Sequence, residues 1–476
     1  MISPIHQQAQ QSPAGIAVSY YSNSGQLVEL SYQTLSQQVS LCQSQLRLAG
    51  ISKGDIIACI APNSIEMVKL YWACVDLGCL FFPISPRFSD QKIDQLLQRF
   101  EVKFAYSNDK QLISSLASQS ITWIDQQRHQ SKGFENDNPA LEVDPSTPQN
   151  IILTSGSTGQ PKAAVHCLNN HIYSAQGSQY MVSLLSRDSW LLSLPLFHIG
   201  GLAILNRCAL IGATVVLRDD KQSLAQQLLR QKITHVSLVP TQANSLLSES
   251  PRALCQLKAL LLGGGMIEQQ LVNALSRLNV ATYTSYGMTE MSSQITTSTA
   301  NHLGFHGKAL PHRELSLRQG VIWVKGPCLF LGYLDNGVIN LPVDNQGWFC
   351  TKDKGELNQN GELAIVGRVD NMFICGGENI QPEEIEAVLL QHSNVKQAIV
   401  FAMPDAKFDK LPAAIVDYVD TSLTAQTNEQ LSQSVIDKLA RFKRPRQFFA
   451  WPQGLEAQGL KVSRKQVIAS ANVKKQ

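Results

Sequence analysis

Short apolar runs that alternate with capped helical segments constrain the fold of this chain most strongly. Ile56–Ile60 and Leu80–Ile84 are two such runs, each of the length of a buried strand. Ile65–Leu77 lies between them as a predicted helix, with Asn63-Ser64 as its candidate N-cap and Gly78 at its end. A strand, a helix and a second strand in this order favour a parallel sheet covered by helices.

The alternation of strand-like and helical segments recurs in the middle of the chain and gives way to a different pattern near residue 320. Strand-like runs return at 213–217, 234–239 and 257–262. From about residue 320, short strands separated by Gly and Asn turns indicate a small β-rich layer, and a new helix and strand follow Asp370. We therefore predict an α/β fold with two domains. Residues 1–369 form a large N-terminal domain of helix-covered parallel-type sheets plus the β-layer, and residues 370–476 form a small C-terminal α+β domain.

The composition excludes several classes of protein. The 476 residues carry a net charge of +3, so no strong field for nucleic acid or a membrane is implied. No apolar run approaches the roughly 18 residues of a membrane helix, and the first residues lack the basic-then-apolar pattern of a secretory leader. The ten cysteines include no C-x-x-C pair, and Cys59, Cys74, Cys208 and Cys255 lie among apolar residues. We expect a reduced, cytoplasmic enzyme.

Residues 153–162, Leu-Thr-Ser-Gly-Ser-Thr-Gly-Gln-Pro-Lys, follow an apolar run and indicate a phosphate-binding loop. Gly156 and Gly159 allow backbone N–H groups to approach an anion. Hydroxyls come from Thr154, Ser155, Ser157 and Thr158, and Lys162 adds a positive charge. The common P-loop pattern fails, because Gln160-Pro161 precedes the lysine and Ala163 follows it. A Ser/Gly-rich surface linker is the alternative, which the second apolar segment at 163–165 disfavours.

A second candidate motif is Tyr286-Gly287-Met288-Thr289-Glu290, which we place just after a predicted strand at 281–284. An aromatic ring beside a glycine suits stacking on a flat base. Thr289 and the Glu290 carboxylate suit a phosphate and its Mg²⁺. A turn with an ordinary core tyrosine is the alternative, and the nearby glycine-rich loop makes it the weaker one.

Two further polar residues belong to the β-rich layer. Asp353 is predicted at a strand end, where its carboxylate could accept both hydroxyls of a ribose. Arg368 could pair with the same ribose or with a phosphate. For Asp353 alone, a capping or turn aspartate is the more probable interpretation, and for Arg368 the alternative is a surface ion pair.

Arg207 is the only charge in a segment, 200–212, that otherwise looks like a buried helix. A buried guanidinium without a partner is costly, so it needs an anion. An internal Asp or Glu and a carboxylate of a bound substrate are nearly equal alternatives. Lys461, flanked by apolar residues after glycines, differs from the solvated basic cluster at 438–444, although its position alone says little.

Taken in order, these motifs resemble the acyl-adenylate-forming superfamily, which includes acyl-CoA synthetases, luciferases and carrier-protein adenylation domains. The resemblance runs from about residue 30 to 470 and, within the superfamily, is strongest to the o-succinylbenzoate–CoA ligase family of menaquinone biosynthesis. The resemblance to the superfamily rests on 154–162, Pro195-Leu-Phe-His198, Gly263-Gly264-Gly265, 286–290, Asp353, 367–370, Gly376-Gly377-Glu378 and Lys461. The resemblance to the ligase family rests on 161–166, 190–198, 235–242, 377–384, 438–442 and 460–464.

The resemblance implies ATP, Mg²⁺ and coenzyme A, and an acyl-adenylate made in a first half-reaction and thioesterified in a second. It places residues 154–162 on the β- and γ-phosphates, Thr289 on the α-phosphate, and Glu290 with Thr158 on Mg²⁺. Tyr286, Gly287 and Gly264-Gly265 would bind adenine, and Asp353 with Arg368 the ribose. Lys461 would bridge the carboxylate and the α-phosphate; with Thr289, Lys162 and His198 it makes up the expected catalytic set.

In the second step the C-terminal domain is expected to turn about Asp370, so that Gly376-Gly377 lines the passage for CoA. His198, Gly287 and Arg207 would line the acid pocket, with Arg207 on the second carboxylate of o-succinylbenzoate. The partners are thus a small carboxylic acid, ATP and CoA, with no nucleic acid and no integral membrane segment; the oligomeric state is not specified.

Three other functions stay open. One is a CoA ligase for another aryl or medium-chain acid. Another is a carrier-protein adenylation domain, although no Ser-bearing carrier segment follows Gln476. The third is a non-catalytic nucleotide-binding protein, which the joint presence of Lys461, Glu290 and Lys162 disfavours.

Overall fold

The computed structural model describes residues 1–116, 121–125, 142–154, 161–265, 267–301, 304–375, 378–405, 409–453 and 464–471. The chain divides into two compact units. The first comprises Met1–Glu314 and Val324–Phe349, and the second comprises Leu315–Trp323 and Cys350–Gln476. The domain boundary predicted near Asp370 falls within the second unit and stays a prediction. Among the described residues, the helices are too short or too polar to cross a membrane.

The first unit contains an eight-stranded sheet in the order β19-β18-β8-β7-β4-β3-β5-β6. Its strands β3 to β6 are parallel, β7 pairs parallel with β4, and β8, β18 and β19 continue antiparallel. The bounds are β3 Ile56–Ile60, β4 Leu80–Ile84, β5 Phe104–Ser107, β6 Thr122–Trp123, β7 Pro148–Thr154, β8 Lys162–Cys167, β18 Gly332–Asp335 and β19 Val338–Asn340.

The second sheet of this unit has nine strands in the order β15-β14-β13-β12-β11-β9-β10-β1-β2. Strands β13, β12, β11, β9, β10 and β1 run parallel, and antiparallel partners flank them on both sides. The bounds are β1 Ile16–Tyr21, β2 Leu27–Ser31, β9 Ser189–Leu192, β10 Thr214–Leu217, β11 His235–Leu238, β12 Ala259–Leu262, β13 Thr282–Met288, β14 Ser293–Thr299 and β15 Lys308–Ala309.

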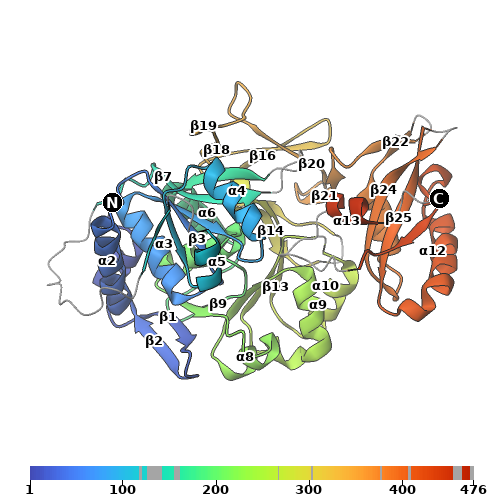
Figure 1. The fold of residues 1–476 in the computed structure, drawn as a ribbon. Helices are drawn as coiled ribbons and strands as arrows, with labels where there is room; N and C mark the ends of the chain where they lie inside the picture. The colour runs from blue at the N-terminus through green and yellow to red at the C-terminus, as the bar shows by residue number, and fades with distance from the viewer. Residues whose placement is uncertain are drawn as a thin grey trace. The chain divides into compact units, whose positions relative to one another are not determined.

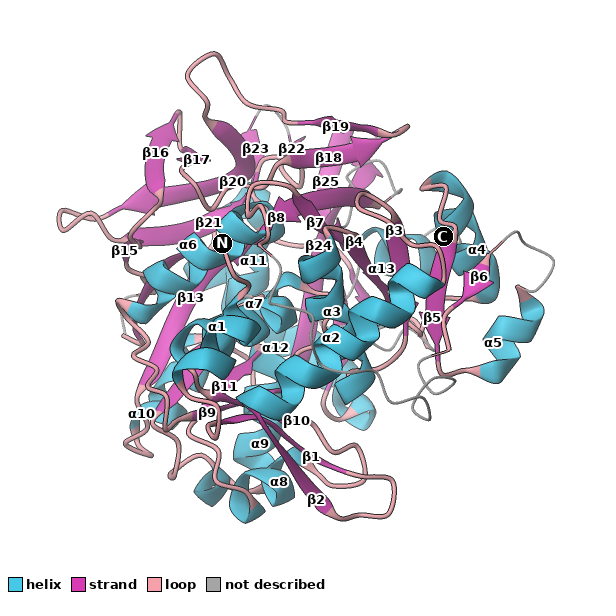
Figure 2. Ribbon diagram, turned by 90° about the vertical axis from the view of Figure 1, so that its left-hand side faces the viewer, coloured by secondary structure: helices cyan, strands magenta, loops and turns pink. Residues whose placement is uncertain are grey.

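Helices cover both sheets on both faces. The described helices of this unit are α1 Pro4–Gln11, α2 Tyr32–Leu48, α3 Ile65–Leu77, α4 Asp90–Arg99, α5 Lys110–Ser115, α6 Leu168–Gln179, α7 Ile199–Ile211, α8 Leu224–Arg230, α9 Pro240–Glu249 and α10 Gln269–Ser276. Figure 2 shows α2 and α3 side by side, and Figure 1 shows the same for α9 and α10. The bounds predicted for α3 are confirmed: Ser64 Oγ accepts the Met67 N–H, and Gly78 ends the helix in the left-handed conformation.

Burial of both strand faces explains the continuous apolar runs. In β3, Ile57 and Cys59 belong to a core that residues of both sheets share with α2, α3, α6 and α7. Their neighbours Ala58 and Ile60 belong to a second core with α4 and α5. A third core joins the other face of the nine-stranded sheet to α8, α9 and α10. The first unit is therefore a layered α/β structure, as predicted.

The second unit contains a four-stranded sheet, a hairpin and a three-stranded sheet. The four-stranded sheet is β16-β17-β20-β21, and parts of β16 and β17 belong to the first unit. Apolar residues of β24 and β25 pack against α11 and α12 on one face and against α13 on the other. The bounds are β16 Glu314–Arg318, β17 Val321–Lys325, β20 Phe349–Leu357, β21 Leu363–Arg368, β22 Phe373–Cys375, β23 Glu378–Ile380, α11 Pro382–Leu389, β24 Val395–Asp405, β25 Asp409–Tyr418, α12 Thr424–Lys438, β26 Phe448–Ala450 and α13 Arg464–Ser470.

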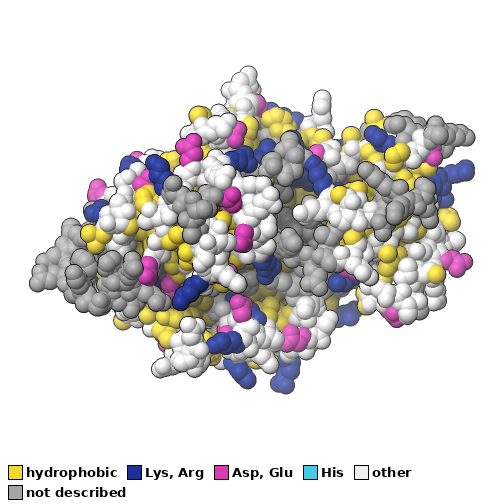
Figure 3. Space-filling model, viewed as in Figure 1, with side chains coloured by type: hydrophobic (Ala, Val, Ile, Leu, Met, Phe, Trp, Pro, Cys, Tyr) yellow, Lys and Arg dark blue, Asp and Glu magenta, His cyan; other side chains and the backbone are white. Residues whose placement is uncertain are grey.

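Three expectations about local structure were wrong. Strand β13 continues to Met288 because β14 pairs with it, so Tyr286 and Gly287 lie inside the strand and not after it. Asp353 lies within β20 and not at a strand end. Cys255 is exposed, whereas eight of the ten free thiols are buried. On the face drawn in Figure 3, basic and acidic side chains are interspersed, in line with the small net charge.

Candidate active site

Thr154 and Lys162 lie opposite each other at the ends of β7 and β8, where the predicted phosphate loop connects the two strands. The loop is thus a hairpin connection between antiparallel strands, which differs from the strand-to-helix turn of a P-loop. Its central residues lie outside the described residues, and the predicted roles of Ser155, Gly156, Ser157, Thr158 and Gly159 stay predictions. The described ends of the loop therefore place Lys162 at the first position of β8, beside the end of β7.

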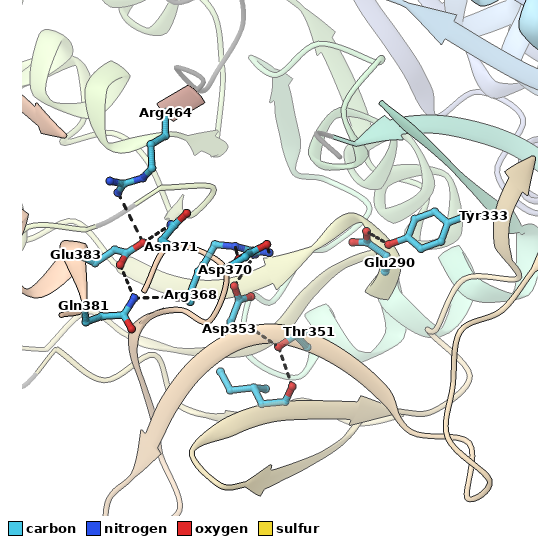
Figure 4. A network of polar contacts seen from close by, with 11 residues as sticks. Glu290, Tyr333, Thr351, Asp353, Arg368, Asp370, Asn371, Gln381, Glu383 and Arg464 are labelled. Atoms are coloured by element: carbon cyan, nitrogen blue, oxygen red, sulfur yellow. Dashed lines mark hydrogen bonds and ion pairs between the residues drawn. The ribbon is translucent and has the colours of Figure 1, made fainter. Parts of the chain in front are cut away.

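Tyr333 joins Lys162 to the predicted metal ligand Glu290. The Lys162 Nζ atom lies 4.5 Å from the centroid of the Tyr333 ring, within the range of a cation–π contact. The Tyr333 hydroxyl donates to Glu290 Oε1 at 2.6 Å, a contact drawn in Figure 4. Pairing of β18 with β8 sets Tyr333 opposite Ala164. The sequence did not single out Tyr333, although a glycine precedes it, which is the aromatic–glycine signal used for Tyr286.

Glu290 is buried in a 3-10 turn, Thr289–Met291, directly after β13. Within the part of the chain that is described, no group of three or more His, Cys, Asp or Glu side chains could hold a metal ion. Mg²⁺ usually binds one or two carboxylates and takes its remaining ligands from phosphates and water. One buried carboxylate, connected to Lys162 through Tyr333, therefore fits a magnesium–nucleotide site better than an all-protein metal site.

A buried chain of hydrogen bonds fixes the backbone at Thr289. Burial lowers the pKa of His166 to about 4, so the ring is neutral at pH 7. Its Nε2–H donates to the Thr289 carbonyl oxygen at 2.8 Å, and its Nδ1 accepts from Asn150 Nδ2 at 3.3 Å. Asn150 Oδ1 in turn accepts from His171 Nε2 at 2.7 Å. The predicted phosphate-binding threonine is thus tied to β7, β8 and α6 through residues that sequence reasoning missed.

The predicted adenine-binding residues lie at the ends of two neighbouring parallel strands. Gly264 comes just after β12, and Tyr286 lies near the end of β13, which pairs with β12. The carboxyl ends of adjacent parallel strands form one edge of a sheet, where α/β enzymes bind ligands. Gly264 has φ +78°, and a Cβ atom on Gly287 would lie 2.0 Å from the Ser293 carbonyl oxygen. The local backbone therefore requires glycine at both positions, whether or not they bind adenine.

His198 and Arg207 both belong to the region of α7. His198 precedes the first residue of this helix, and Asn63 holds the preceding loop by bonding Leu194 O and Leu196 N. A Cβ atom on Gly201 would lie 2.2 Å from the Pro195 carbonyl oxygen. The second glycine of the Gly200-Gly201 pair therefore lets α7 begin directly against that loop.

Arg207 is buried, with 4% of its surface exposed. Its Nη2 atom donates to Gln294 Oε1 at 2.6 Å and to Ser293 Oγ at 3.3 Å, and its Cζ lies 5.2 Å from the centroid of the Trp190 ring. Its Nε–H has no hydrogen-bond partner among the described residues. Burial, followed by the charge of Arg313, lowers the pKa of Arg207 to about 9. The guanidinium therefore stays charged at pH 7 with neutral acceptors, and the alternative of an internal Asp or Glu finds no support within the described part.

In the second unit, Asp353 and Arg368 face each other across β20 and β21. Arg368 Nη1 bonds Asp353 Oδ1 at 2.7 Å, and Arg368 Nε bonds Asp370 Oδ1 at 3.0 Å. The Asp353 N–H donates to Thr351 Oγ1, which Figure 4 shows with the rest of the network. The two predicted ribose ligands are thus brought together. Arg368 also makes the ion pair that was its alternative interpretation, and the ribose roles stay predictions.

Lys461, Gly376 and Gly377 lie outside the described residues, so their predicted roles stay predictions. The nearest described residue after Lys461 is Arg464, at the start of α13. Its guanidinium bonds Glu386 Oε1 at 2.7 Å and lies 3.7 Å from Glu383 Oε1, both on α11. Figure 4 shows Arg464 beside Glu383. The described chain that resumes at Arg464 is therefore bonded to α11.

Taken together, the helix-covered sheets, the paired strand ends at Thr154 and Lys162 and the buried Glu290 are the features expected of a nucleotide-binding α/β enzyme. Residues 5–334 match the AMP-binding enzyme family, and residues 384–457 match the AMP-binding enzyme C-terminal domain. The chain belongs to the AMP-binding enzyme family.

Individual relatives narrow the comparison. The chain is 37% identical to the 2-succinylbenzoate–CoA ligase of Haemophilus influenzae over 441 residues, which cover 92% of each chain. It is 29% identical to o-succinylbenzoate CoA synthetase (MenE) from Bacillus subtilis in complex with the acyl-adenylate intermediate OSB-AMP, with a TM-score of 0.87 over 98% of each chain. The complex of that protein with ATP and magnesium ion gives a TM-score of 0.85 at 29% identity, over 98% of this chain and 99% of the other.

Proposed function

We propose that this chain is an AMP-forming acid–thiol ligase that converts 2-succinylbenzoate, ATP and CoA to 2-succinylbenzoyl-CoA, AMP and pyrophosphate in menaquinone biosynthesis. Ligases of this name match nearly the whole chain, which supports the reaction class. The choice of acid rests on one observation, the buried and charged Arg207, whose described hydrogen-bond acceptors are neutral. A substrate with a second carboxylate supplies the anion that this arginine lacks.

In the first half-reaction a carboxylate attacks the α-phosphorus of ATP, and negative charge builds on the phosphate oxygens. Fixed donors and cations there lower the barrier. Lys162 and the loop from Thr154 bind the β- and γ-phosphates, and Thr289 binds the α-phosphate. Glu290 holds Mg²⁺, which neutralises phosphate charge when bound. Lys461 stabilises the attacking carboxylate.

Adenine binds between Tyr286 and Gly264-Gly265, and Asp353 with Arg368 binds the ribose. After pyrophosphate leaves, the C-terminal part of the chain turns about Asp370. Lys461 moves away, and Gly376-Gly377 lines the passage for the pantetheine arm of CoA. The thiolate then attacks the acyl carbon, and AMP departs. Such hinge motion is a common way to use one site for two reactions.

The acid pocket distinguishes this function from a CoA ligase for another acid. His198 borders the same pocket as Arg207, and Arg207 binds the second carboxylate through charge-assisted hydrogen bonds. An aryl or medium-chain monocarboxylate would leave the Arg207 charge buried and unpaired, which is unfavourable. We therefore expect selection for a dicarboxylic acid.

Product analysis tests the proposal. The full chain is incubated with Mg²⁺, ATP, CoA and a panel of carboxylic acids that includes 2-succinylbenzoate. We expect CoA-dependent release of AMP and pyrophosphate, fastest with 2-succinylbenzoate. Faster turnover of a monocarboxylate would transfer the assignment to another acid, adenylate formation without use of CoA would indicate a carrier-protein adenylation domain, and binding of ATP without turnover would indicate a nucleotide-binding protein.

A further inference from the structure

Gln294 is the principal hydrogen-bond acceptor of Arg207. It lies in β14, is buried with 3% of its surface exposed, and its Oε1 accepts from Arg207 Nη2 at 2.6 Å. The distance is that of a strong hydrogen bond. The acceptor carries no net charge, so it satisfies one N–H of the guanidinium and leaves the positive charge in place.

The orientation of the Gln294 amide is fixed by its neighbours. Gln294 Nε2 donates to Thr297 Oγ1 at 2.7 Å, and the Thr297 hydroxyl donates to the Thr296 carbonyl oxygen at 2.8 Å. Because the threonine hydrogen is already used, Thr297 Oγ1 must accept from the amide nitrogen. A flipped amide would direct N–H groups at the guanidinium. The oxygen of Gln294 therefore faces Arg207.

The backbone of Gln294 is fixed as well. Its carbonyl oxygen accepts from Arg313 Nε at 2.5 Å, and Arg313 Nη2 also bonds Ser174 Oγ on α6 at 3.0 Å. On another side of Arg207, the Trp190 ring contacts the guanidinium, and Trp190 Nε1 is held by Ser237 Oγ at 3.1 Å. Gln294 and Trp190, which position Arg207 together with Ser293, are thus themselves held by hydrogen bonds, and all three are uncharged.

We propose that Gln294 is a specificity-determining positioning residue, which holds the Arg207 guanidinium in place without neutralising it, so that its charge selects an acid with two carboxylates. The inference rests on the proposed function, in which Arg207 binds the second carboxylate. A glutamate at this position would have nearly the same shape but would form an internal ion pair with Arg207. The enzyme would then lose its preference for a dianionic acid while its nucleotide site remained intact.

The test compares Gln294→Glu with the wild type on 2-succinylbenzoate and on the analogue in which hydrogen replaces the second carboxylate. We expect kcat/KM for 2-succinylbenzoate to fall on the order of 10- to 100-fold, as for a lost hydrogen bond to a charged group. The analogue should be affected much less, so the ratio between the two acids falls. The KM for ATP should stay near the wild-type value.

A matched control variant is available in the same unit. Gln227 is also buried, and its Oε1 accepts from Arg218 Nη1 at 2.8 Å. Gln227 lies on α8, so Gln227→Glu places a carboxylate beside a different arginine and should leave the preference between the two acids unchanged. Gln294→Leu removes the acceptor but keeps the Arg207 charge, so it should weaken binding of 2-succinylbenzoate yet retain the preference for it.

Failure of this inference and failure of the proposed function would give different results in these assays. If the wild type makes AMP from 2-succinylbenzoate and prefers it to the analogue, but Gln294→Glu keeps that preference, Gln294 does not set specificity and the inference is overturned. If the wild type itself does not prefer the dicarboxylate, the assigned substrate is wrong. If Gln294→Glu does not fold, a Gln294→Leu enzyme that has lost the preference would overturn the inference.

Discussion

Replacing Arg207 by methionine tests whether this residue is retained for the substrate or for the fold. Burial lowers the pKa of the guanidinium from its ordinary value to about 9. At 1.36 kcal/mol for each tenfold change in proton affinity, the folded protein disfavours the charged form by roughly 5 kcal/mol. The group is nevertheless charged at pH 7, because 7 lies below 9. A bound carboxylate recovers part of this free energy.

The expected effect on activity follows from the lost charge-assisted hydrogen bonds. Such bonds contribute about 1.5–3 kcal/mol, so kcat/KM for 2-succinylbenzoate should fall about 10- to 150-fold in Arg207→Met. The KM for ATP should not change, because the side chains that Arg207 contacts, Ser293, Gln294 and Trp190, are not predicted nucleotide ligands. Steady-state kinetics with each substrate varied in turn measures both quantities.

Arg207→Met should lower activity but should not lower the stability of the folded protein. The variant removes the desolvation cost of roughly 5 kcal/mol but leaves Gln294 Oε1 without its donor, which costs about 1–3 kcal/mol. The midpoint of thermal unfolding without ligand should therefore stay the same or rise. Arg313→Met is the matched control, because that buried arginine is bonded to carbonyl oxygens of Gln294, Pro311 and Ser174 and should lose stability. An Arg207→Met enzyme with unchanged kcat/KM for the acid, or with lower stability and a raised KM for ATP, would refute the reasoning.

Three further predictions concern the nucleotide site. Tyr333→Phe removes the hydrogen bond to Glu290, so the Mg²⁺ concentration for half-maximal ATP binding should change several-fold; an unchanged value would mean that Tyr333 does not position Glu290. The pKa of His166 is lowered from 6.5 to about 4, so the unfolded state binds more protons between these values, and the contribution of this histidine to the free energy of unfolding should fall by roughly 3 kcal/mol as pH drops from 6.5 to 4. His166→Gln should flatten this slope in urea titrations, and an equally steep slope would contradict the assignment. Lys461→Ala should abolish adenylation but spare thioesterification of supplied acyl-adenylate, whereas equal loss in both would indicate a structural lysine.

Local signals predicted the elements that depend on neighbouring residues. Ile56–Ile60, Ile65–Leu77 and Leu80–Ile84 were bounded correctly, because the cap at Ser64 and the stop at Gly78 act within one helical turn. The end of β13 was placed too early because its last residues are held by β14, which forms only when the chain folds back. Sheet pairing of this kind is a tertiary effect that local propensity does not reveal.

In the candidate site, too, local sequence indicated some features and tertiary contacts determined others. The chemical types needed at Lys162, Glu290 and Arg207 were visible in the sequence. Their partners were not, because Tyr333 is 43 residues from Glu290 and Gln294 is 87 residues from Arg207. Whether a buried arginine meets a carboxylate or an amide depends on which strand lies beside it. Among the described residues an amide, Gln294, lies beside Arg207, which the composition of α7 alone could not reveal.

An oxygen-transfer measurement tests the central claim most directly. The wild-type chain is supplied with ATP, Mg²⁺, CoA and 2-succinylbenzoate labelled with ¹⁸O in its carboxylates, and the AMP is analysed by mass spectrometry. Attack of the carboxylate on the α-phosphorus, followed by attack of the thiol on the acyl carbon, leaves one substrate oxygen on the phosphate. We predict AMP that carries one ¹⁸O atom. Unlabelled AMP, or label in inorganic phosphate together with ADP, would contradict the proposed function.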